Sequence, residues 1–97
     1  MIVLYYFDWD ENKNRINLEK HGITFEEAST VFFDDRAILF DDPEHSIDED
    51  RFLLLGTSET AKVCIVCHCY RESDTVIRII SARQATRKEE QRYVRGI

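Results

Sequence analysis

The stretch that decides the fold is KVCIVCHCYRESDTVIRIISAR, which runs from Lys62 to Arg83. It contains two runs rich in β-branched and aromatic residues, 62–70 and 75–83, separated by a short polar segment. Such runs, bounded by polar turn residues, are typical of neighbouring β-strands. We therefore predict two antiparallel strands here. The second is apolar on both faces apart from its arginines, which predicts a central strand.

Three further runs extend the predicted sheet. Upstream of the central pair, RAILF (36–40) and RFLLLG (51–56) are β-rich and follow one another at close spacing. The four runs should therefore form an antiparallel meander. Near the N-terminus, IVLYYF (2–7) predicts one more strand.

Three helices are predicted from their capping residues. Asp8 or Asp10 can cap a helix that runs to Lys20 and that Gly22 ends. Two capping boxes, Thr24 with Glu27 and Thr86 with Glu89, open a helix over roughly 25–33 and a C-terminal helix through about Arg95. The expected order, β-α-α-β-β-β-β-α, is that of an α+β domain with two helices after its first strand.

Composition indicates one compact domain over residues 1–97, because 43% of the residues are hydrophobic and only three Gly and one Pro are present. The opening MIVLYYFDWD has too short an apolar run for a membrane span and lacks the basic leader of a signal peptide. We therefore expect a cytoplasmic protein that does not contact a membrane.

Charge is distributed unevenly along the chain. The net charge of −6 argues against indiscriminate binding to nucleic acid. Residues 34–50 hold eight acids and one base, whereas residues 78–97 hold six bases and two acids. The basic C-terminal segment suits a phosphate-bearing ligand or an acidic partner. Alternatively, the two segments neutralise each other.

The first predicted helix lacks an ordinary apolar stripe. Lys13, Asn17, Lys20 and His21 fall at i, i+4, i+7 and i+8, so they predict one polar face. This face is either a ligand-binding surface or simply solvated. The residues expected to anchor the ends of the helix are Trp9, Ile16, Ile23 and Phe25.

The run Cys64-Ile-Val-Cys67-His68 matches the attachment motif of a c-type haem, and it also suggests zinc. In a strand, however, side chains alternate, so Cys64 and His68 would face one way while Cys67 and Cys69 face the other. We therefore interpret the cysteines as small buried hydrophobic residues and expect neither a metal nor another cofactor.

Three polar residues of the two central strands have open roles. His68 is either a core histidine or a phosphate-binding and proton-transferring group at a strand end. Alternation places Val76, Arg78, Ile80 and Ala82 on one face of the last strand and Ile77, Ile79, Ser81 and Arg83 on the other. Arg78 is either a structural ion-pair partner or a ligand-binding cation. Arg83, at the strand end beside the basic helix, is the better candidate for a phosphate clamp.

Four segments together resemble the BrnT toxins of bacterial type II toxin–antitoxin modules: FDWDENKNRINLEKHGITFEEA (7–28), DPEHSIDEDRFLLLG (42–56), VCHCYR (66–71) and RIISARQATRKEEQRY (78–93). The resemblance implies a RelE-like fold and a ribonuclease that blocks translation by cutting RNA. It also implies a hetero-oligomer with a ribbon-helix-helix antitoxin of the BrnA type. The family's polar motif positions, carried over, are Lys13, Asn17, Lys20, His21, His45, Glu49, Arg51, His68, Arg78, Arg83 and Tyr93.

Metal-free RNA cleavage needs a base for the ribose 2′-hydroxyl, cations for the developing charge and an acid for the leaving oxygen, and it leaves a 2′,3′-cyclic phosphate. We predict a catalytic set of His21, Arg51, His68, Arg83 and Tyr93. The predicted RNA-binding set is Lys13, Asn17, Lys20, Arg78, Arg87 and Lys88. Two alternatives are a non-enzymatic interaction module with a basic docking surface and a metal or redox protein built on the cysteines.

Overall fold

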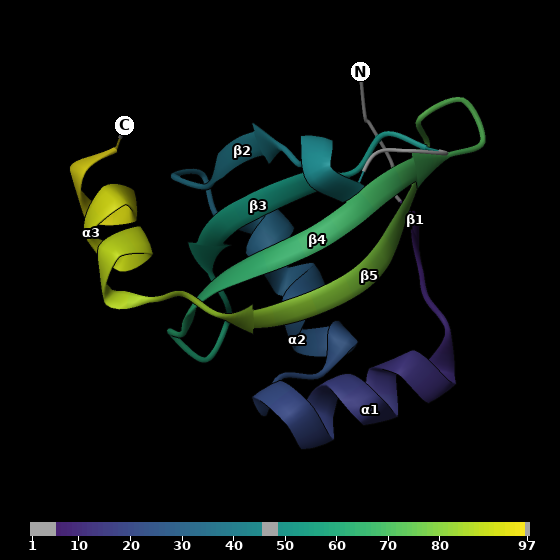
Figure 1. Ribbon diagram of the computed structural model, residues 1–97, viewed down its shortest axis with the longest axis horizontal. Helices are drawn as coiled ribbons and strands as arrows, with labels where there is room; N and C mark the ends of the chain where they lie inside the picture. Colours follow the sequence, from purple (N-terminus) through teal and green to yellow (C-terminus); the bar gives the residue numbers. More distant parts are fainter. Residues whose placement is uncertain (1–5, 46–48, 97) are drawn as a thin grey trace.

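The computed structural model describes residues 6–45 and 49–96, and five strands of this part form one sheet in the order β1-β5-β4-β3-β2 (Figure 1). The strands are β1 (Tyr6–Asp8), β2 (Ile38–Asp41), β3 (Phe52–Thr57), β4 (Val63–Arg71) and β5 (Val76–Gln84). The helices are α1 (Glu11–His21), α2 (Phe25–Thr30) and α3 (Arg87–Arg95), with 3-10 turns η1 (Val31–Phe33) and η2 (Pro43–His45).

The predicted antiparallel meander is confirmed, because β2, β3, β4 and β5 pair in sequence with antiparallel register. Strand β1 adds to the outside of β5 and runs parallel to it, a pairing that the sequence did not predict. Residues 2–5 of the predicted first strand lie outside the described residues.

The helix ends follow the predicted caps, but the capping box of Thr24 with Glu27 is only half formed. Thr24 accepts the Glu27 N–H, while the Glu27 side chain accepts from Ser58 and Thr60. The side chain of Asp10 accepts a hydrogen bond from the Lys13 N–H, and Gly22 closes α1 at φ +72°, a value that favours glycine. Helix α2 stops at Thr30 instead of Phe33 and tightens into η1, since β-branched and aromatic residues are weak helix formers. None of the described helices is long and apolar enough to cross a membrane.

Helix α3 begins with the predicted capping box, in which Thr86 and Glu89 each accept the other's backbone N–H. None of the nine residues of α3, all of which the structure describes, is buried. The helix contacts β3 and stands beside the sheet (Figure 1). Helix α3 is therefore attached to the sheet by partly exposed side chains and not by a buried face.

One face of the sheet carries the core. Helices α1 and α2 cover this face, and α2 is visible behind the strands (Figure 1). Its buried residues include Ile23, Phe25, Ala28, Val31, Leu54, Cys64, Val66, Ile79 and Ala82. A Cβ on Gly56 would lie 2.9 Å from Val31 Cγ1, so glycine allows η1 to approach β3 closely. We call the opposite side of the sheet the outer face.

A β-bulge changes which side chains of β5 share a face. Cys67 pairs with Ser81 but His68 pairs with Ile79, so the register skips Ile80. The predicted simple alternation along 76–83 is therefore wrong beyond Ile79. Ala82 joins the core beside Ile79. Arg83 shifts to the outer face, the same side as Arg78 and Ser81.

Buried asparagines replace the missing apolar stripe of α1. Asn17 Nδ2 donates to the carbonyls of Ile23 (2.9 Å) and Ala82 (2.8 Å), and Asn17 Oδ1 accepts from the Ala82 N–H at 3.0 Å. Asn14 Oδ1 likewise accepts from the Phe25 N–H at 2.8 Å. The prediction of an exposed stripe through Asn17 is wrong, because this side chain hydrogen-bonds backbone groups in the interior.

The expected anchors of α1 are found at three of four positions. Ile23 and Phe25 are fully buried, and the Trp9 ring packs edge-on against Phe25 at a centroid distance of 6.2 Å. Ile16, in contrast, is 43% exposed and lies on the solvent side of the helix. The anchoring residues therefore flank α1, while its middle is held by Asn14 and Asn17.

Candidate active site

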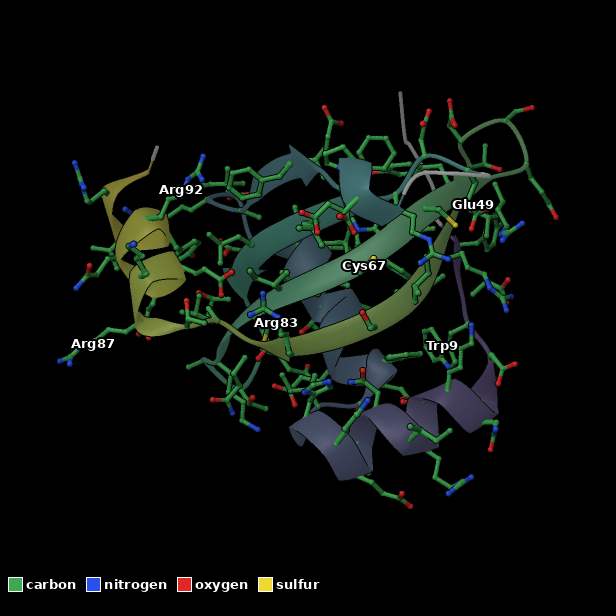
Figure 2. The ribbon with its side chains drawn as sticks, viewed as in Figure 1. Trp9, Glu49, Cys67, Arg83, Arg87 and Arg92 are labelled. Carbon is green, nitrogen blue, oxygen red and sulfur yellow. The ribbon has the colours of Figure 1, made fainter. Side chains whose placement is uncertain are left out.

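A pocket of about 420 Å³ opens on the outer face of the sheet, and we call it the outer-face pocket. Leu53, Ile65 and Ile80, from three adjacent strands, supply apolar lining. The other lining residues are His21, Asp42, Glu44, Arg51, Cys67, Ser81, Ala82 and Arg83. Figure 2 shows Cys67 near the middle of the sheet and Arg83 near the end of β5 that leads to α3. The pocket thus combines two arginines, two carboxylates, one histidine and an apolar surface, in a volume large enough for a nucleotide.

Three of the predicted catalytic residues, His21, Arg51 and Arg83, line this pocket. They come from separate parts of the chain: the last turn of α1, the residue before β3, and the end of β5. Arg83 reaches the outer face because of the bulge at Ile80. The fold therefore brings together residues that are far apart in sequence and that have the chemistry required for RNA binding and cleavage.

Arg83 is held by a two-pronged ion pair with Glu89 of α3. Its Nη1 donates to Glu89 Oε1 at 2.8 Å and its Nη2 donates to Glu89 Oε2 at 3.0 Å. The hydrogen bonds from Arg83 lower the pKa of Glu89 to about 2, and they raise the pKa of Arg83. Both groups are therefore charged throughout the physiological range.

Arg51 lies beside the acidic residues that precede β3. Its Nε is 4.0 Å from Glu49 Oε1, and Glu49 Oε2 also accepts a hydrogen bond from Arg71 Nη2 at 3.2 Å. The Arg51 side chain is about one third exposed, so its cation is accessible from the pocket. Two cations, Arg51 and Arg83, therefore contribute to the wall of the same pocket.

Cys67 contributes a protonated thiol to the pocket. Burial raises its pKa to about 11, and the nearby Asp42 carboxylate adds to this effect. The thiol donates to Asp42 Oδ2 at 3.8 Å. A thiol with such a high pKa is a poor nucleophile near neutral pH, so Cys67 shapes the pocket without supplying covalent chemistry.

His68 lies in the core, on the opposite side of the sheet from the outer-face pocket. Its side chain is fully buried, its Nδ1 is 3.1 Å from the Val66 carbonyl oxygen, and the ring packs edge-on against Phe32. Burial lowers the pKa of His68, so the imidazole is neutral at physiological pH. The core-histidine interpretation is confirmed, and we remove His68 from the candidate site.

Tyr93 attaches α3 to the rest of the protein. Its hydroxyl donates to Asp34 Oδ2 at 2.6 Å, and the same oxygen accepts the Thr57 N–H at 2.8 Å. Burial, followed by the hydrogen bond to Asp34, raises the pKa of Tyr93. Tyr93 does not line the outer-face pocket. It positions the helix that carries Glu89.

The predicted RNA-binding residues are distributed over three places. Arg78 Nη1 donates to Asp8 Oδ2 at 2.6 Å, so Arg78 forms the ion pair that was one of its two predicted roles. Lys13 and Lys20 are exposed on α1 outside the lining of the pocket, and Asn17 is buried. Arg87 and Lys88 are exposed in the first turn of α3, and Arg87 points away from the sheet in Figure 2.

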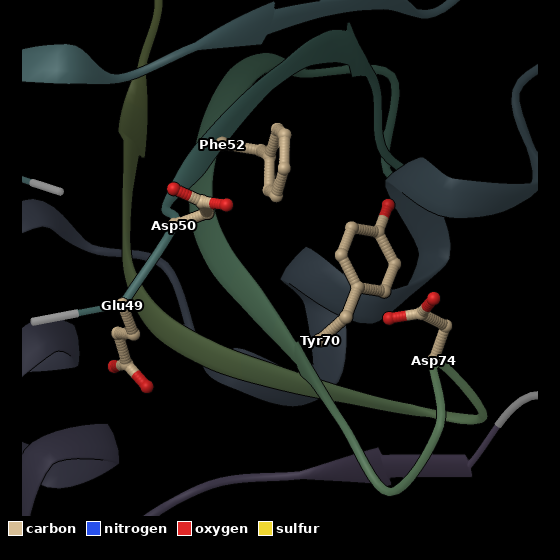
Figure 3. Close-up of a pocket in the computed structure, with 5 residues that line it drawn as sticks. All are labelled: Glu49, Asp50, Phe52, Tyr70 and Asp74. Carbon is tan, nitrogen blue, oxygen red and sulfur yellow. The ribbon is translucent and has the colours of Figure 1, made fainter.

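A second pocket, of about 490 Å³, is lined by acidic and aromatic residues. Its lining residues are Glu49, Asp50, Phe52, Tyr70 and Asp74. Figure 3 shows the Phe52 and Tyr70 rings between the carboxylates of Asp50 and Asp74, while Glu49 points away from the rings. No arginine or lysine is among these lining residues to offset the repulsion between the three carboxylates and phosphate, so this pocket is less suited to the RNA backbone than the outer-face pocket. The side chain of the family-motif residue His45 lies outside the described part of the structure.

Several residues of the outer-face pocket and its surroundings were not predicted from the sequence. Asp42 and Glu44 were counted only as part of an acidic segment, although both line the pocket. Glu89 was identified as a helix cap, but its second role as the partner of Arg83 was not. Only the position of Cys67 could be predicted from the sequence, because strand alternation placed it on the opposite face of the sheet from His68.

The cysteine–histidine motif does not form a metal site. Cys64 packs in the core beside Val66, whereas Cys67 lines the outer-face pocket. The three cysteines are free and buried, as predicted. Over residues 6–45 and 49–96, no group of three or more potential ligands lies close enough to hold a metal ion.

Comparison with known proteins identifies the family. Residues 9–89 match the sequence model of a family described as the ribonuclease toxin, BrnT, of type II toxin–antitoxin systems. The fold is similar to the crystal structure of the Brucella abortus ribonuclease toxin BrnT, with a TM-score of 0.67 and 22% sequence identity. The superposition covers 86% of this chain and 99% of the Brucella chain. No curated protein is significantly similar to the chain in sequence.

At 22% identity the structural likeness shows the fold alone, and it confirms the predicted α+β, RelE-like fold. The family assignment rests on the sequence match, which spans most of the chain. The chain therefore belongs to the BrnT family of ribonuclease toxins of type II toxin–antitoxin systems.

Proposed function

We propose that the outer-face pocket is the site at which this toxin binds and cleaves RNA. The observation that carries the proposal is the convergence of His21, Arg51 and Arg83 on one pocket with an apolar lining. Arginine side chains suit phosphate oxygens, and apolar surface suits an unstacked base. The family assignment favours this interpretation over a non-enzymatic interaction module. We place the activity in the cytoplasm, where messenger RNA is translated.

The proposed reaction needs no metal ion. His21 accepts the proton of a ribose 2′-hydroxyl, and the 2′-oxygen attacks the adjacent phosphorus. Arg83 and Arg51 stabilise the negative charge that develops on the phosphate oxygens. The bond from phosphorus to the 5′-oxygen then breaks, and water in the open pocket protonates the leaving oxygen. The products are a 2′,3′-cyclic phosphate and a free 5′-hydroxyl.

The chemistry of the RNA ends tests this proposal. The purified full chain should cut single-stranded RNA equally well in EDTA and in Mg²⁺, and the upstream fragment should carry a 2′,3′-cyclic phosphate. Mass spectrometry distinguishes this end from a 3′-phosphate or a 3′-hydroxyl. Activity that disappears in EDTA, or fragments that carry a 5′-phosphate, would contradict the mechanism.

The partner of a type II toxin is an antitoxin, and we propose one of the ribbon-helix-helix, BrnA-like type in a hetero-oligomer with this chain. The basic residues of α3 and the outer-face pocket form the surface that such a partner would mask, because free toxin must expose this surface to RNA. Expression of the chain alone should inhibit translation and growth. Co-expression with a ribbon-helix-helix protein encoded beside this chain should restore both, and a failure to restore growth would reject such a partner.

A further inference from the structure

We propose that Glu89 is an internal competitor for RNA phosphate at Arg83, so that α3 sets how tightly the outer-face pocket binds RNA. The inference rests on the proposed function, because it requires Arg83 to be a phosphate clamp. A carboxylate and a phosphate present the same feature to a guanidinium, two oxygens that accept parallel hydrogen bonds. The two groups therefore compete for one edge of Arg83.

The geometry shows that this edge is occupied. Both terminal nitrogens of Arg83 donate to Glu89, at 2.8 and 3.0 Å, and Nη1 also lies 3.3 Å from the Gln84 carbonyl oxygen. Nevertheless, the Arg83 side chain is 42% exposed and lines the pocket. An RNA phosphate in the pocket reaches the guanidinium, but it obtains a two-pronged contact with the two terminal nitrogens only if Glu89 is displaced.

Helix α3 is attached in a way that permits such a displacement. Besides the Arg83–Glu89 pair, Tyr93 bonds to Asp34, and the Arg92 guanidinium lies 4.3 Å from the centroid of the Phe40 ring. None of the residues of α3, which is described throughout, is buried. A movement of its first turn therefore exposes little apolar surface, and the main cost of releasing Arg83 is the loss of its ion pair with Glu89, which contacts to the phosphate replace.

The competition is independent of pH near neutrality. Because the pKa of Glu89 lies at about 2, its carboxylate is ionised at any physiological pH. Protonation therefore does not release Arg83, whereas a ligand that offers a phosphate in place of the carboxylate does. Because RNA must displace Glu89 before its phosphate pairs with both terminal nitrogens of Arg83, Glu89 weakens the binding of RNA to the pocket.

A pair of isosteric substitutions tests the proposal. Glu89→Gln removes the charge but keeps an oxygen that can accept the Thr86 N–H, so the capping box is preserved. Glu90→Gln makes the same charge change at the next, exposed position of α3 and is the matched control. Binding is measured by fluorescence anisotropy with a single-stranded 2′-O-methyl RNA, which lacks the attacking hydroxyl. Glu89→Gln should bind about threefold to tenfold more tightly than Glu90→Gln.

Two further measurements separate the proposal from its premise. The gain in RNA affinity from Glu89→Gln should vanish in the Arg83→Ala background. The RNA affinity of the Glu89→Gln protein should also fall more steeply with salt than that of wild type, by about one phosphate contact. Suppose that Arg83→Ala weakens RNA binding, so that the clamp stands. Equal affinity of Glu89→Gln and Glu90→Gln for RNA, or weaker binding by Glu89→Gln, would then overturn the competition. If Arg83→Ala binds RNA as wild type does, the clamp itself is wrong.

Discussion

Replacement of Asn17 by Ala should lower the free energy of unfolding by about 3 kcal/mol, because it removes three buried hydrogen bonds to the backbone. The Ala82 N–H and the carbonyls of Ile23 and Ala82 would remain in the interior without these partners. Unsatisfied buried groups of this kind cost about 1–3 kcal/mol each, and partial relaxation keeps the total below their sum. A domain of this size is typically stable by about 5–15 kcal/mol, so the loss is large.

Urea unfolding, followed by the fluorescence of the single tryptophan, Trp9, measures this effect directly. Asn12→Ala is the matched control, since Asn12 is exposed on the same helix and its side chain accepts a hydrogen bond from Arg15, which is also on α1. The control should change stability by less than about 0.5 kcal/mol. An Asn17→Ala protein as stable as the control would contradict the role of Asn17 as the attachment of α1 to β5.

The second large effect concerns catalysis. His21→Ala should reduce the rate of RNA cleavage by about a hundredfold to a thousandfold, because it removes the proposed proton acceptor from the pocket. His21 is exposed in the last turn of α1, so the stability of the fold should change little. The rate is measured with saturating protein in a single turnover, which separates cleavage from product release.

Arg15→Ala is the control for His21→Ala. Arg15 is exposed on the same helix, does not line the outer-face pocket, and pairs with Glu19 at 3.2 Å. Its removal should leave the cleavage rate near that of wild type. If His21→Ala also cleaves at the wild-type rate, then the proton acceptor is a different group. A lower rate accompanied by lower melting temperature would instead indicate damage to α1.

The parts of the fold that depend on local sequence were predictable. Gly22 ends α1 in the left-handed conformation, and the capping box of Thr86 with Glu89 opens α3, because these contacts lie within three or four residues of each other. Strand alternation correctly separated Cys64 from Cys67. Where a conformation depends only on residues that are close in sequence, the sequence pattern was sufficient to predict it.

The remaining features depend on contacts between distant segments. The bulge at Ile80 arises from the pairing of β5 with β4 and leaves no local mark, yet it decides that Arg83 faces the pocket. The polar face of α1 looked solvated or functional, but Asn17 bonds to Ala82, 65 residues away. A hydrophobicity pattern cannot distinguish a side chain that faces water from one that hydrogen-bonds the backbone of another element.

The most direct test of the account is a map of where RNA binds. Backbone amide signals of the ¹⁵N-labelled full chain are followed by NMR during titration with a short single-stranded 2′-O-methyl RNA. Shifts should concentrate at the outer-face pocket, at Cys67, Ser81 and Arg83. The signals of the acidic pocket, at Phe52, Tyr70 and Asp74, should stay unchanged. Shifts at the acidic pocket with none at Ser81 and Arg83 would contradict the account.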